Sequence, residues 1–427
     1  MVKRFYKADI YTTDAIHHAP TKKYGSVGTM PALSAKKNTI IGLFSLFFIL
    51  FFAVGIEAQE SIPLGDTVLA MNTVNEDAII LYDVNNESYR RLELGVGAHH
   101  VWDFSPDGCR LLLTLDSDLY SVRLDGSDLQ KMLVYNDLPP EQWRVWEPDW
   151  SPNPENQRIA FTFERQQSIN GELTTTHHIA YVTPDNPTPE FYSVSGTEFS
   201  PTWSPNGEWL AYISFEQRVA GANVLATALP TIEPPAGQTP APVSLLNEGH
   251  MWVVKADASV KYHLTRFETG SVTKPRWSHD SELISFIWSP QNSSDMLWMI
   301  ANRPGAIPTQ LSYAWAMVLE YSWLPDDTGL LGAMREFRDI QPNTLWKLPL
   351  VSSDDSTAEL YMPTLDISHA DFPRFSSDGN WLAVRSAYEM MLIQLSTGEG
   401  QLLDRSTMGN TAGVWSPAGF SGEASCQ

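Results

Sequence analysis

The chain has 427 residues and a formal net charge of −22 at pH 7. Its first 37 residues are basic, so the acidity lies in the rest of the chain. This balance argues against nucleic-acid binding, because a protein that neutralises phosphates needs clustered Lys and Arg. Hydrophobic residues make up 43% of the chain and aromatic residues 11%, which is far too much for a disordered chain. We therefore expect a large packed core.

An uncharged, strongly apolar stretch covers residues 40–56 and follows Lys36 and Lys37. Its length lies between that of a signal-peptide core and that of a membrane-spanning helix, which needs about 20 apolar residues. The positive-inside rule keeps the lysine flank in the cytoplasm, so both interpretations place the following residues outside. This stretch is also the predicted contact with the membrane.

We accordingly predict a basic cytoplasmic leader over residues 1–37, with Met30 as an alternative start. A helix over residues 38–58 then serves as a signal peptide or as a membrane anchor. Cleavage near Ala58 would give a periplasmic or extracellular protein, whereas an uncleaved helix would hold the protein at the cell membrane. The remaining residues, 59–427, are expected to form the exported body.

One short pattern recurs in this body: an aromatic residue, a turn such as Ser-Pro-Asp-Gly, and an alternating apolar strand. Its seven copies are 40 to 74 residues apart, which is the range of β-propeller blades. Pro presets the turn, Asp or Asn hydrogen-bonds to nearby backbone, and Gly supplies a positive φ. The aromatic residue is expected to end a first strand and to fill the wedge between neighbouring sheets. The residues to which we assign this structural role are Phe104, Asp107, Gly108, Trp150, Trp203, Gly207, Trp277, Asp280, Trp323, Asp326, Phe375, Asp378, Gly379 and Trp415.

The two ends of the body complement each other. Only 12 residues follow the last copy at Trp415, whereas residues 66–95 have the pattern of three strands without a motif before them. Pairing the N-terminal segment with the C-terminal strand would complete one blade and remove an exposed sheet edge. We predict an all-β, seven-bladed β-propeller. Because the tail FSGEASCQ departs from the repeat, a six-bladed ring is the alternative.

A Pro-, Ala- and Thr-rich stretch near residues 219–249 explains the longest interval between motifs. Its composition predicts an extended loop insertion, either a variable loop or a partner-docking segment.

The turn motif, followed by Trp-Leu-Ala, resembles the WD40-like PD40 repeat of TolB-type propellers. The copies at Trp203 and Phe375 match best. The same repeat occurs in the propeller domains of prolyl-oligopeptidase and dipeptidyl-peptidase-like enzymes. The resemblance covers about residues 66–420 and implies the fold. It implies no particular activity, because the motif residues are structural in that family.

The sequence lacks several common catalytic motifs. It contains no G-x-S-x-G nucleophile elbow, phosphate-binding glycine loop or H-E-x-x-H. The pairs His99-His100 and His177-His178 are interpreted as solvated or hydrogen-bonded strand residues, the first pair preceding the first strand of a blade. Adjacent strand residues point to opposite faces, so each pair could supply only one inward metal ligand. We expect no cofactor and no metal.

Several other residues permit a functional interpretation. The recurring turn aspartates could bind calcium, but a turn-forming role explains them. Some tryptophans outside the motif could line a ligand surface, although core packing accounts for them better. These tryptophans are Trp102, Trp146, Trp252, Trp298 and Trp315.

Only two cysteines occur, Cys109 and Cys426, which excludes a four-cysteine zinc site. An exported protein meets oxidising conditions. We therefore hypothesise that a disulfide between them latches the ring, the alternative being two free or buried thiols.

These observations predict an extracytoplasmic, non-catalytic propeller that binds a protein, peptide or glycan, with other envelope or extracellular proteins as partners. One alternative is a propeller enzyme, a lyase or hydrolase with its site at the mouth of the central channel. Another is a membrane-anchored sensor or accessory subunit. Fold alone does not choose among them.

Overall fold

The computed structural model describes residues 63–426, apart from residues 96, 140–141, 170–171, 194, 220–244, 291–292, 313–315, 337–341, 351–357, 363–364, 366, 368, 387–388 and 404–412. Contacts divide the chain into residues 1–60 and residues 61–427. The predicted leader and the predicted signal or anchor helix lie outside the described residues. Within the described part, no helix is long and apolar enough to cross a membrane.

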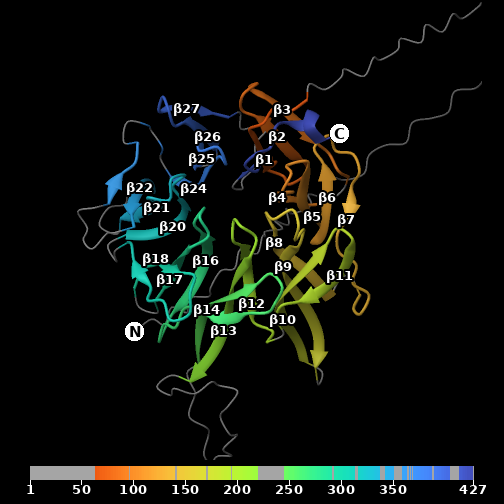
Figure 1. Ribbon diagram of the computed structural model, residues 1–427, viewed down its shortest axis with the longest axis vertical. Coiled ribbons are helices and arrows are strands. Elements are labelled where there is room, and N and C mark those ends of the chain that lie inside the picture. The colour runs from red at the N-terminus through yellow and green to blue at the C-terminus, as the bar shows by residue number, and fades with distance from the viewer. Residues whose placement is uncertain are drawn as a thin grey trace, which may run out of the picture. The chain divides into compact units, whose positions relative to one another are not determined.

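The described chain is built from β-strands, which form five four-stranded sheets and one eight-stranded sheet. The eight-stranded sheet consists of two four-stranded sets that share one parallel residue pair, Gly249 with Ser271. Counting this sheet as one blade or as two gives six or seven blades. Within residues 61–427 the sheets follow one another in chain order (Figure 1). The fold is therefore the all-β propeller that the repeat predicts.

Each set has the same strand order, with a first strand at one edge and a fourth strand at the other. The first strands are β4 (His99–Phe104), β8 (Trp143–Trp150), β12 (Glu198–Trp203), β16 (Ser271–Trp277), β20 (Ala316–Trp323), β24 (Ala370–Phe375) and β28 (Val414–Trp415). The second strands are β5 (Arg110–Leu115), β9 (Ile159–Ile169), β13 (Trp209–Val219), β17 (Leu283–Ser289), β21 (Gly329–Glu336), β25 (Trp381–Ser386) and β1 (Val68–Asn72). Every first strand ends at the aromatic residue of its motif, as predicted.

The outer strands complete each set. The third strands are β6 (Asp118–Arg123), β10 (Glu172–Thr183), β14 (Leu245–Lys255), β18 (Met296–Ala301), β22 (Thr344–Pro349), β26 (Glu389–Gln394) and β2 (Ile79–Asp83). The fourth strands are β7 (Gln130–Lys131), β11 (Asn186–Phe191), β15 (Lys261–His263), β19 (Thr309–Gln310), β23 (Glu359–Leu360), β27 (Glu399–Leu402) and β3 (Ser88–Leu92). A short 3-10 helix, Glu423–Cys426, ends the described chain.

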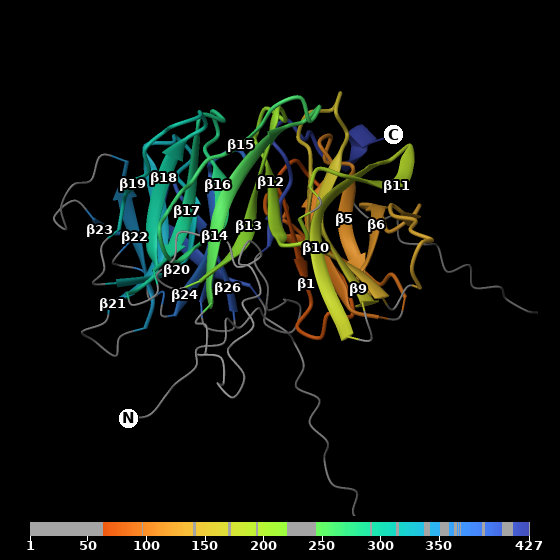
Figure 2. The same cartoon turned by 90° about the horizontal axis from the view of Figure 1, so that it is seen from below.

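The hairpins β9–β10 and β13–β14 are built from strands of 11 or 12 residues and belong to successive sets (Figure 2). Strands β13 and β14 extend into the predicted loop insertion near residues 219–249, so the segment between them is shorter than predicted. Val219 is the last residue of β13, and residues 245–249 belong to β14. The intervening residues 220–244 lie outside the described residues.

The motif turns are held by side chains. In the first copy, the Ser105 hydroxyl donates to Asp107 Oδ1 at 2.6 Å and accepts the Arg110 N–H at 2.9 Å. The Cys109 N–H donates to the same carboxylate oxygen at 3.0 Å. The corresponding Ser and Asp or Asn residues at positions 204–206, 278–280 and 376–378 repeat this pattern. The turn aspartates of these copies thus have the structural role that the sequence predicts.

Three of the five motif tryptophans also connect successive sets, whereas the indole nitrogens of Trp150 and Trp203 have no hydrogen-bond partner among the described residues. Trp277 Nε1 donates to the carbonyl of Thr202 at 3.0 Å, and Trp323 Nε1 donates to the carbonyl of Arg276 at 3.1 Å. In the last copy, Trp415 Nε1 donates to the carbonyl of Arg374 at 3.1 Å. In these three copies the indole N–H has a hydrogen-bond partner in the preceding set, while the rings fill the space between two sheets.

Chain ends meet in the set β28-β1-β2-β3, where Leu69 pairs with Trp415 and Ala70 with Val414. One face of this sheet packs on β5 and β6, and the other face packs on β25 and β26. This pairing confirms that residues 66–95 complete the sheet that begins with the last motif. The N- and C-terminal segments close the ring together.

Gly108 is the clearest test of the turn geometry. Its φ is +75°, and an added Cβ would lie 2.4 Å from the ring of Phe420, a buried side chain of the C-terminal segment. Gly305 has nearly the same φ, +74°, but nothing lies within 4 Å of its Cβ position. A comparison of the same substitution at the two glycines therefore distinguishes backbone strain from a packing clash.

We predict that Gly305→Ala lowers the free energy of unfolding by about 1 kcal/mol through backbone strain alone. Gly108→Ala should lower it by about 2 to 4 kcal/mol, because overpacking adds to the same strain. Urea unfolding of both variants measures the difference. Equal losses would show that Phe420 does not hold its position against this turn.

Candidate functional site

Several charged residues of the first strands contact the neighbouring set. The first strands of neighbouring sets contact one another, so they form the inner edge of the propeller. A group of their charged side chains lies at or next to the strand irregularity before the motif aromatic. We call this group the first-strand cluster, which consists of Asp103, Glu147, Asp149, Lys274, Arg276, Glu320 and Arg374.

Carboxyl groups occupy β4 and β8. Asp103 accepts the Phe104 N–H at 2.7 Å and the Trp150 N–H at 3.1 Å. Asp149 repeats the second contact one set further on, accepting the Trp203 N–H at 2.6 Å. Each carboxyl thus fastens the next motif aromatic through its backbone.

The same carboxyls have displaced pKa values. Loss of hydration raises the pKa of Asp149 to about 7, and it raises that of Asp103 well above its usual value, with repulsion from Asp149 adding to the effect. Glu147 also has a raised pKa because the surrounding protein limits its hydration, although its side chain is exposed and accepts the Ser200 hydroxyl at 2.8 Å. This half of the cluster therefore binds protons more readily than ordinary carboxylates do.

Cations occupy the other half. The side chain of Glu320 on β20 is only 6% exposed, and Lys274, Arg276 and Arg374 surround it at 2.7, 2.9 and 3.6 Å. Burial by itself would raise the pKa of Glu320, but the three cations outweigh it and lower the pKa to about 2. Three positive charges face one negative charge, so this half keeps a net positive charge.

The arginines and lysine are also tied to backbone and to an aromatic ring. Arg374 donates to the carbonyl of Tyr321 at 3.2 Å, and Lys274 donates to the carbonyl of Leu319 at 2.7 Å. Arg276 lies 5.3 Å from the centroid of the Tyr321 ring, a cation–π distance. The cluster is thus a fixed surface with acidic and basic halves. It offers complementary sites to a ligand that carries both signs of charge.

In each histidine pair the two side chains point to opposite faces of their sheet, and each has a hydrogen-bond partner. His99 and His100 are the first two residues of β4, not residues before it, because the β4–β5 pairing extends to them. His99 Nδ1 lies 3.0 Å from the carbonyl oxygen of Glu76, and His100 Nδ1 lies 3.0 Å from Asn72 Nδ2. Burial lowers the pKa of His100 to about 4, so this histidine is neutral at pH 7.

The second pair lies within β10. His177 Nε2 is 3.3 Å from Glu164 Oε2, and His178 Nε2 is 3.0 Å from Arg165 Nη2. Within the described ranges, no group of three or more His, Cys, Asp or Glu residues could hold a metal ion. Both pairs therefore have a structural explanation in hydrogen bonding.

The tryptophans outside the motif do not gather into one surface. Trp102 Nε1 donates to the Thr114 hydroxyl at 3.0 Å, and Trp146 Nε1 donates to Glu164 at 3.1 Å. Trp252 stacks on His263, and Trp298 belongs to a hydrophobic core cluster. Trp315 lies outside the described residues. Those that are described have packing or hydrogen-bonding roles.

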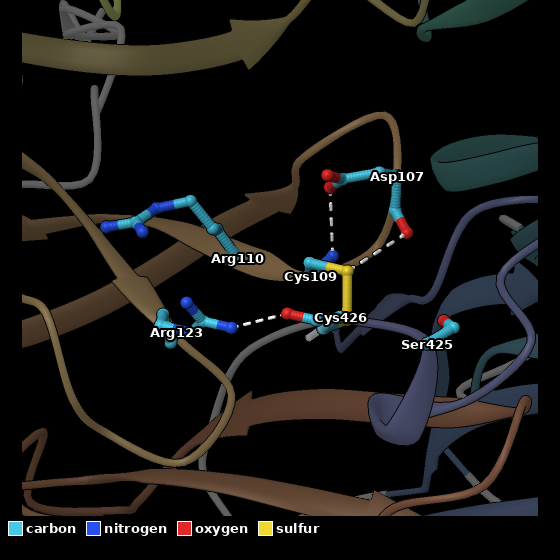
Figure 3. Close-up of a pocket in the computed structure, with 6 residues that line it drawn as sticks. All are labelled: Asp107, Cys109, Arg110, Arg123, Ser425 and Cys426. Atoms are coloured by element: carbon cyan, nitrogen blue, oxygen red, sulfur yellow. Dashed lines mark hydrogen bonds between the residues drawn. A yellow bond between two sulfur atoms is a disulfide. The ribbon is translucent and has the colours of Figure 1, made fainter.

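The two cysteines form a disulfide, so the hypothesis of a covalent latch is confirmed over that of two thiols. Figure 3 shows the bond beside a cavity of about 390 Å³ lined by Asp107, Cys109, Arg110, Arg123, Ser425 and Cys426. The Arg123 guanidinium donates to the carbonyl of Cys426. Disulfides persist in oxidising compartments, which agrees with the expected extracytoplasmic location.

Other contacts join the 3-10 helix to the start of the chain. Glu423 forms a two-point ion pair with Arg90, at 2.6 and 2.9 Å, and its carboxylate also accepts the Leu64 N–H at 3.0 Å. In return, the Glu423 N–H donates to the Leu64 carbonyl at 2.9 Å. The C-terminal end is therefore bound to the N-terminal strands and to the next sheet at once.

Sequence reasoning missed the first-strand cluster, although a signal for it exists. Four motif copies have the pattern X-Pro-X-aromatic, beginning at Glu147, Ser200, Lys274 and Phe372. All four of these residues have a positive φ, between 48° and 54°. The register of each strand pair shifts at the same place, as in a β-bulge. The repeated proline marks the strand irregularity around which the cluster is arranged.

Comparisons with known proteins support the fold. No family model matches the sequence, and no curated protein sequence matches it. A crystal structure of a puromycin hydrolase mutant matches with a TM-score of 0.55 and 12% identity, over 80% of this chain and 53% of that chain. This chain thus spans about half the length of that protein.

Two further solved structures are similar at lower scores. TolB from Acinetobacter baumannii matches with a TM-score of 0.43 and 12% identity, over 83% of this chain and 67% of that chain. An oligogalacturonate lyase in complex with manganese matches with a TM-score of 0.49 and 13% identity, over 75% and 87% of the two chains. The structural neighbours are thus TolB-like and related β-propeller proteins at low identity. This likeness shows the fold alone.

The raised pKa of Asp149 gives a pH dependence of known sign. Between about pH 4 and pH 7 the folded protein holds a proton on this carboxyl that the unfolded chain has lost, so its stabilising contribution falls as pH rises. Asp149→Asn should flatten the fall in unfolding free energy across this range, measured by urea unfolding at several pH values. His100 acts in the opposite direction over an overlapping range, so the difference from wild type is the quantity to compare.

Asp280→Asn is the matched control, because the pKa of Asp280 is lowered and its contribution lies below about pH 4. Its slope between pH 4 and pH 7 should equal that of wild type. The same slope in wild type and Asp149→Asn would contradict a proton held at this position.

The disulfide joins residues 317 positions apart, for which the loop-length relation gives an upper limit of about 6 kcal/mol. We predict that Cys426→Ser lowers the melting temperature by several degrees. Dithiothreitol should lower the melting temperature of wild type by the same amount and leave the variant unchanged. No difference between oxidised wild type and the variant would show that the other terminal contacts suffice.

Proposed function

We propose that this chain is an extracytoplasmic, non-catalytic β-propeller that binds a protein, peptide or glycan at the inner edge of its sheets. The observation that carries this proposal is the first-strand cluster, with acids on β4 and β8 and cations on β16 and β24. Its charged groups already have protein partners, as expected of a surface that is fixed before a ligand arrives. The envelope or extracellular proteins expected from the sequence are its proposed partners.

Preorganisation supports binding. A ligand that meets fixed side chains does not have to order them, so less of the interaction energy is lost. A surface with acidic and basic halves also discriminates between ligands, because like charges that are brought together disfavour wrong partners. Lys274 and Glu147 are the exposed members of the two halves and would meet a ligand first.

We also propose seven blades and export across the cytoplasmic membrane. The single residue pair that joins β14 to β16 is a weak basis for one blade, whereas each of the two sets has its own motif and four strands. The disulfide supports an oxidising compartment. The apolar residues 40–56 supply the signal or the membrane anchor.

A second candidate is an enzyme, for example a lyase or hydrolase that acts on glycans. One observation favours it: the pKa of Asp149 is about 7, which suits a general acid or base near neutral pH. Against it, Asp149 and its neighbour Asp103 each accept a backbone N–H, so both carboxyls have a structural role.

The test compares capture of envelope components by three forms of the full chain. The cluster variant combines Glu147→Lys with Lys274→Glu and keeps the net charge. The control variant combines Glu155→Lys with Lys131→Glu, which exchanges exposed charges outside the cluster. Components that wild type enriches should fall at least tenfold with the cluster variant and stay within twofold with the control, as quantified by mass spectrometry.

Equal capture by wild type and the cluster variant would contradict binding through the first-strand cluster. Turnover of an oligosaccharide or peptide by wild type that Asp149→Asn abolishes would instead support the enzyme. Melting temperatures of all variants distinguish lost binding from lost folding.

A further inference from the structure

The two sulfurs of the disulfide have different surroundings. Cys109 lies in the turn between β4 and β5, where its N–H donates to the Asp107 carboxylate at 3.0 Å. Cys426 lies in a 3-10 helix that has no buried residue, and its carbonyl accepts from Arg123. Both cysteines are partly exposed and line the cavity of about 390 Å³ (Figure 3).

Because of these surroundings, a thiolate on one cysteine would be more stable than a thiolate on the other. A thiolate on Cys109 would form 3.7 Å from the Asp107 carbonyl oxygen, in the residue whose N–H binds the Asp107 carboxylate, and both groups oppose a negative sulfur. A thiolate on Cys426 would form in the residue whose carbonyl oxygen accepts from the Arg123 guanidinium, and this positive charge favours it. The other arginine of the cavity, Arg110, is already held by Asp128 at 2.8 Å. Because a better-stabilised thiolate leaves faster, exchange should occur in one direction.

We propose that this cavity is a thiol–disulfide exchange site at which a dithiol reductant protein attacks Cys109 and releases Cys426 as the thiolate. The incoming thiolate forms a bond to Cys109 Sγ while the bond between the two cysteines breaks. The electron pair of the broken bond passes to Cys426 Sγ. The second thiol of the reductant then attacks the reductant's first sulfur, which is bonded to Cys109 in the mixed disulfide, and Cys109 is released as a thiol. The reductant becomes a disulfide, and the two cysteines take up two electrons and two protons.

Reduction would open the C-terminal end without opening the ring. Glu423 would keep its contacts with Arg90 and Leu64, and Phe420 would stay in the core that the N-terminal strands share with β5 and β6. The pairing of Leu69 with Trp415 is independent of the sulfurs. The change is thus confined to the end of the 3-10 helix and can be reversed by oxidation.

The experiment uses the oxidised full chain and thioredoxin whose second active-site cysteine is replaced by serine, so that the mixed disulfide is trapped. Peptide mapping of the adduct should place thioredoxin on Cys109 and an alkylatable thiol on Cys426. An adduct on Cys426 would overturn the proposed direction. No adduct after several hours at micromolar thioredoxin would show that the disulfide is purely structural.

Arg123→Gln tests the stabilised leaving group. We expect the trapping rate to fall at least tenfold, with a melting temperature close to that of wild type. Arg91→Gln is the control, since Arg91 is a half-exposed arginine outside the cavity that pairs with Asp77 and Glu93. Its rate should stay within twofold of wild type. An unchanged rate in Arg123→Gln would overturn the role of this arginine.

Discussion

Two residue pairs between β28 and β1 join the ends of the chain, and the remaining structure depends on them. Without this pairing the sheet of β1, β2 and β3 would lack its first strand and present an exposed edge. Ser416 strengthens the junction by donating its N–H to the carbonyl of Val68 at 2.8 Å and accepting the Val68 N–H at 3.1 Å. Such a short pairing explains why further contacts gather at the same place. The disulfide, the ion pair of Glu423 and the burial of Phe420 all hold the C-terminal segment to its neighbours.

The packing of successive sets side by side creates the first-strand cluster. Glu320 is buried among cations from β16 and β24, the strands on either side of it. A buried carboxylate without these partners would be strongly destabilising. Asp103 and Asp149 have no such cations beside them in the described part of the chain, and burial instead favours their protonated forms. Each also accepts a backbone N–H of the next set. The position directly before the motif aromatic therefore carries a proton-binding carboxyl on β4 and β8 and an arginine on β16 and β24.

The proton-binding carboxyls and the disulfide lie in different parts of the fold. The carboxyls lie at the inner edge, on first strands, whereas the disulfide joins a motif turn to the C-terminal helix. A change of pH at the inner edge and a change of redox conditions at the terminal helix would thus affect separate contacts. The binding surface and the terminal latch can be varied independently by mutation.

The amino-acid sequence by itself determined the repeat, because each motif acts locally. Ser105, Asp107 and Gly108 form their turn through contacts within a few residues, so the pattern was readable in every copy. The complementary chain ends were also readable, since a missing strand and a surplus strand are properties of the repeat. Only the tertiary structure decided which charges meet. Lys274, Glu320 and Arg374 are far apart in the chain and lie on three different sheets. The sequence left two alternatives for Cys109 and Cys426, a disulfide or two thiols, and the structure decided between them. Such long-range contacts depend on how the sheets are placed around the ring, which no local pattern in the sequence specifies.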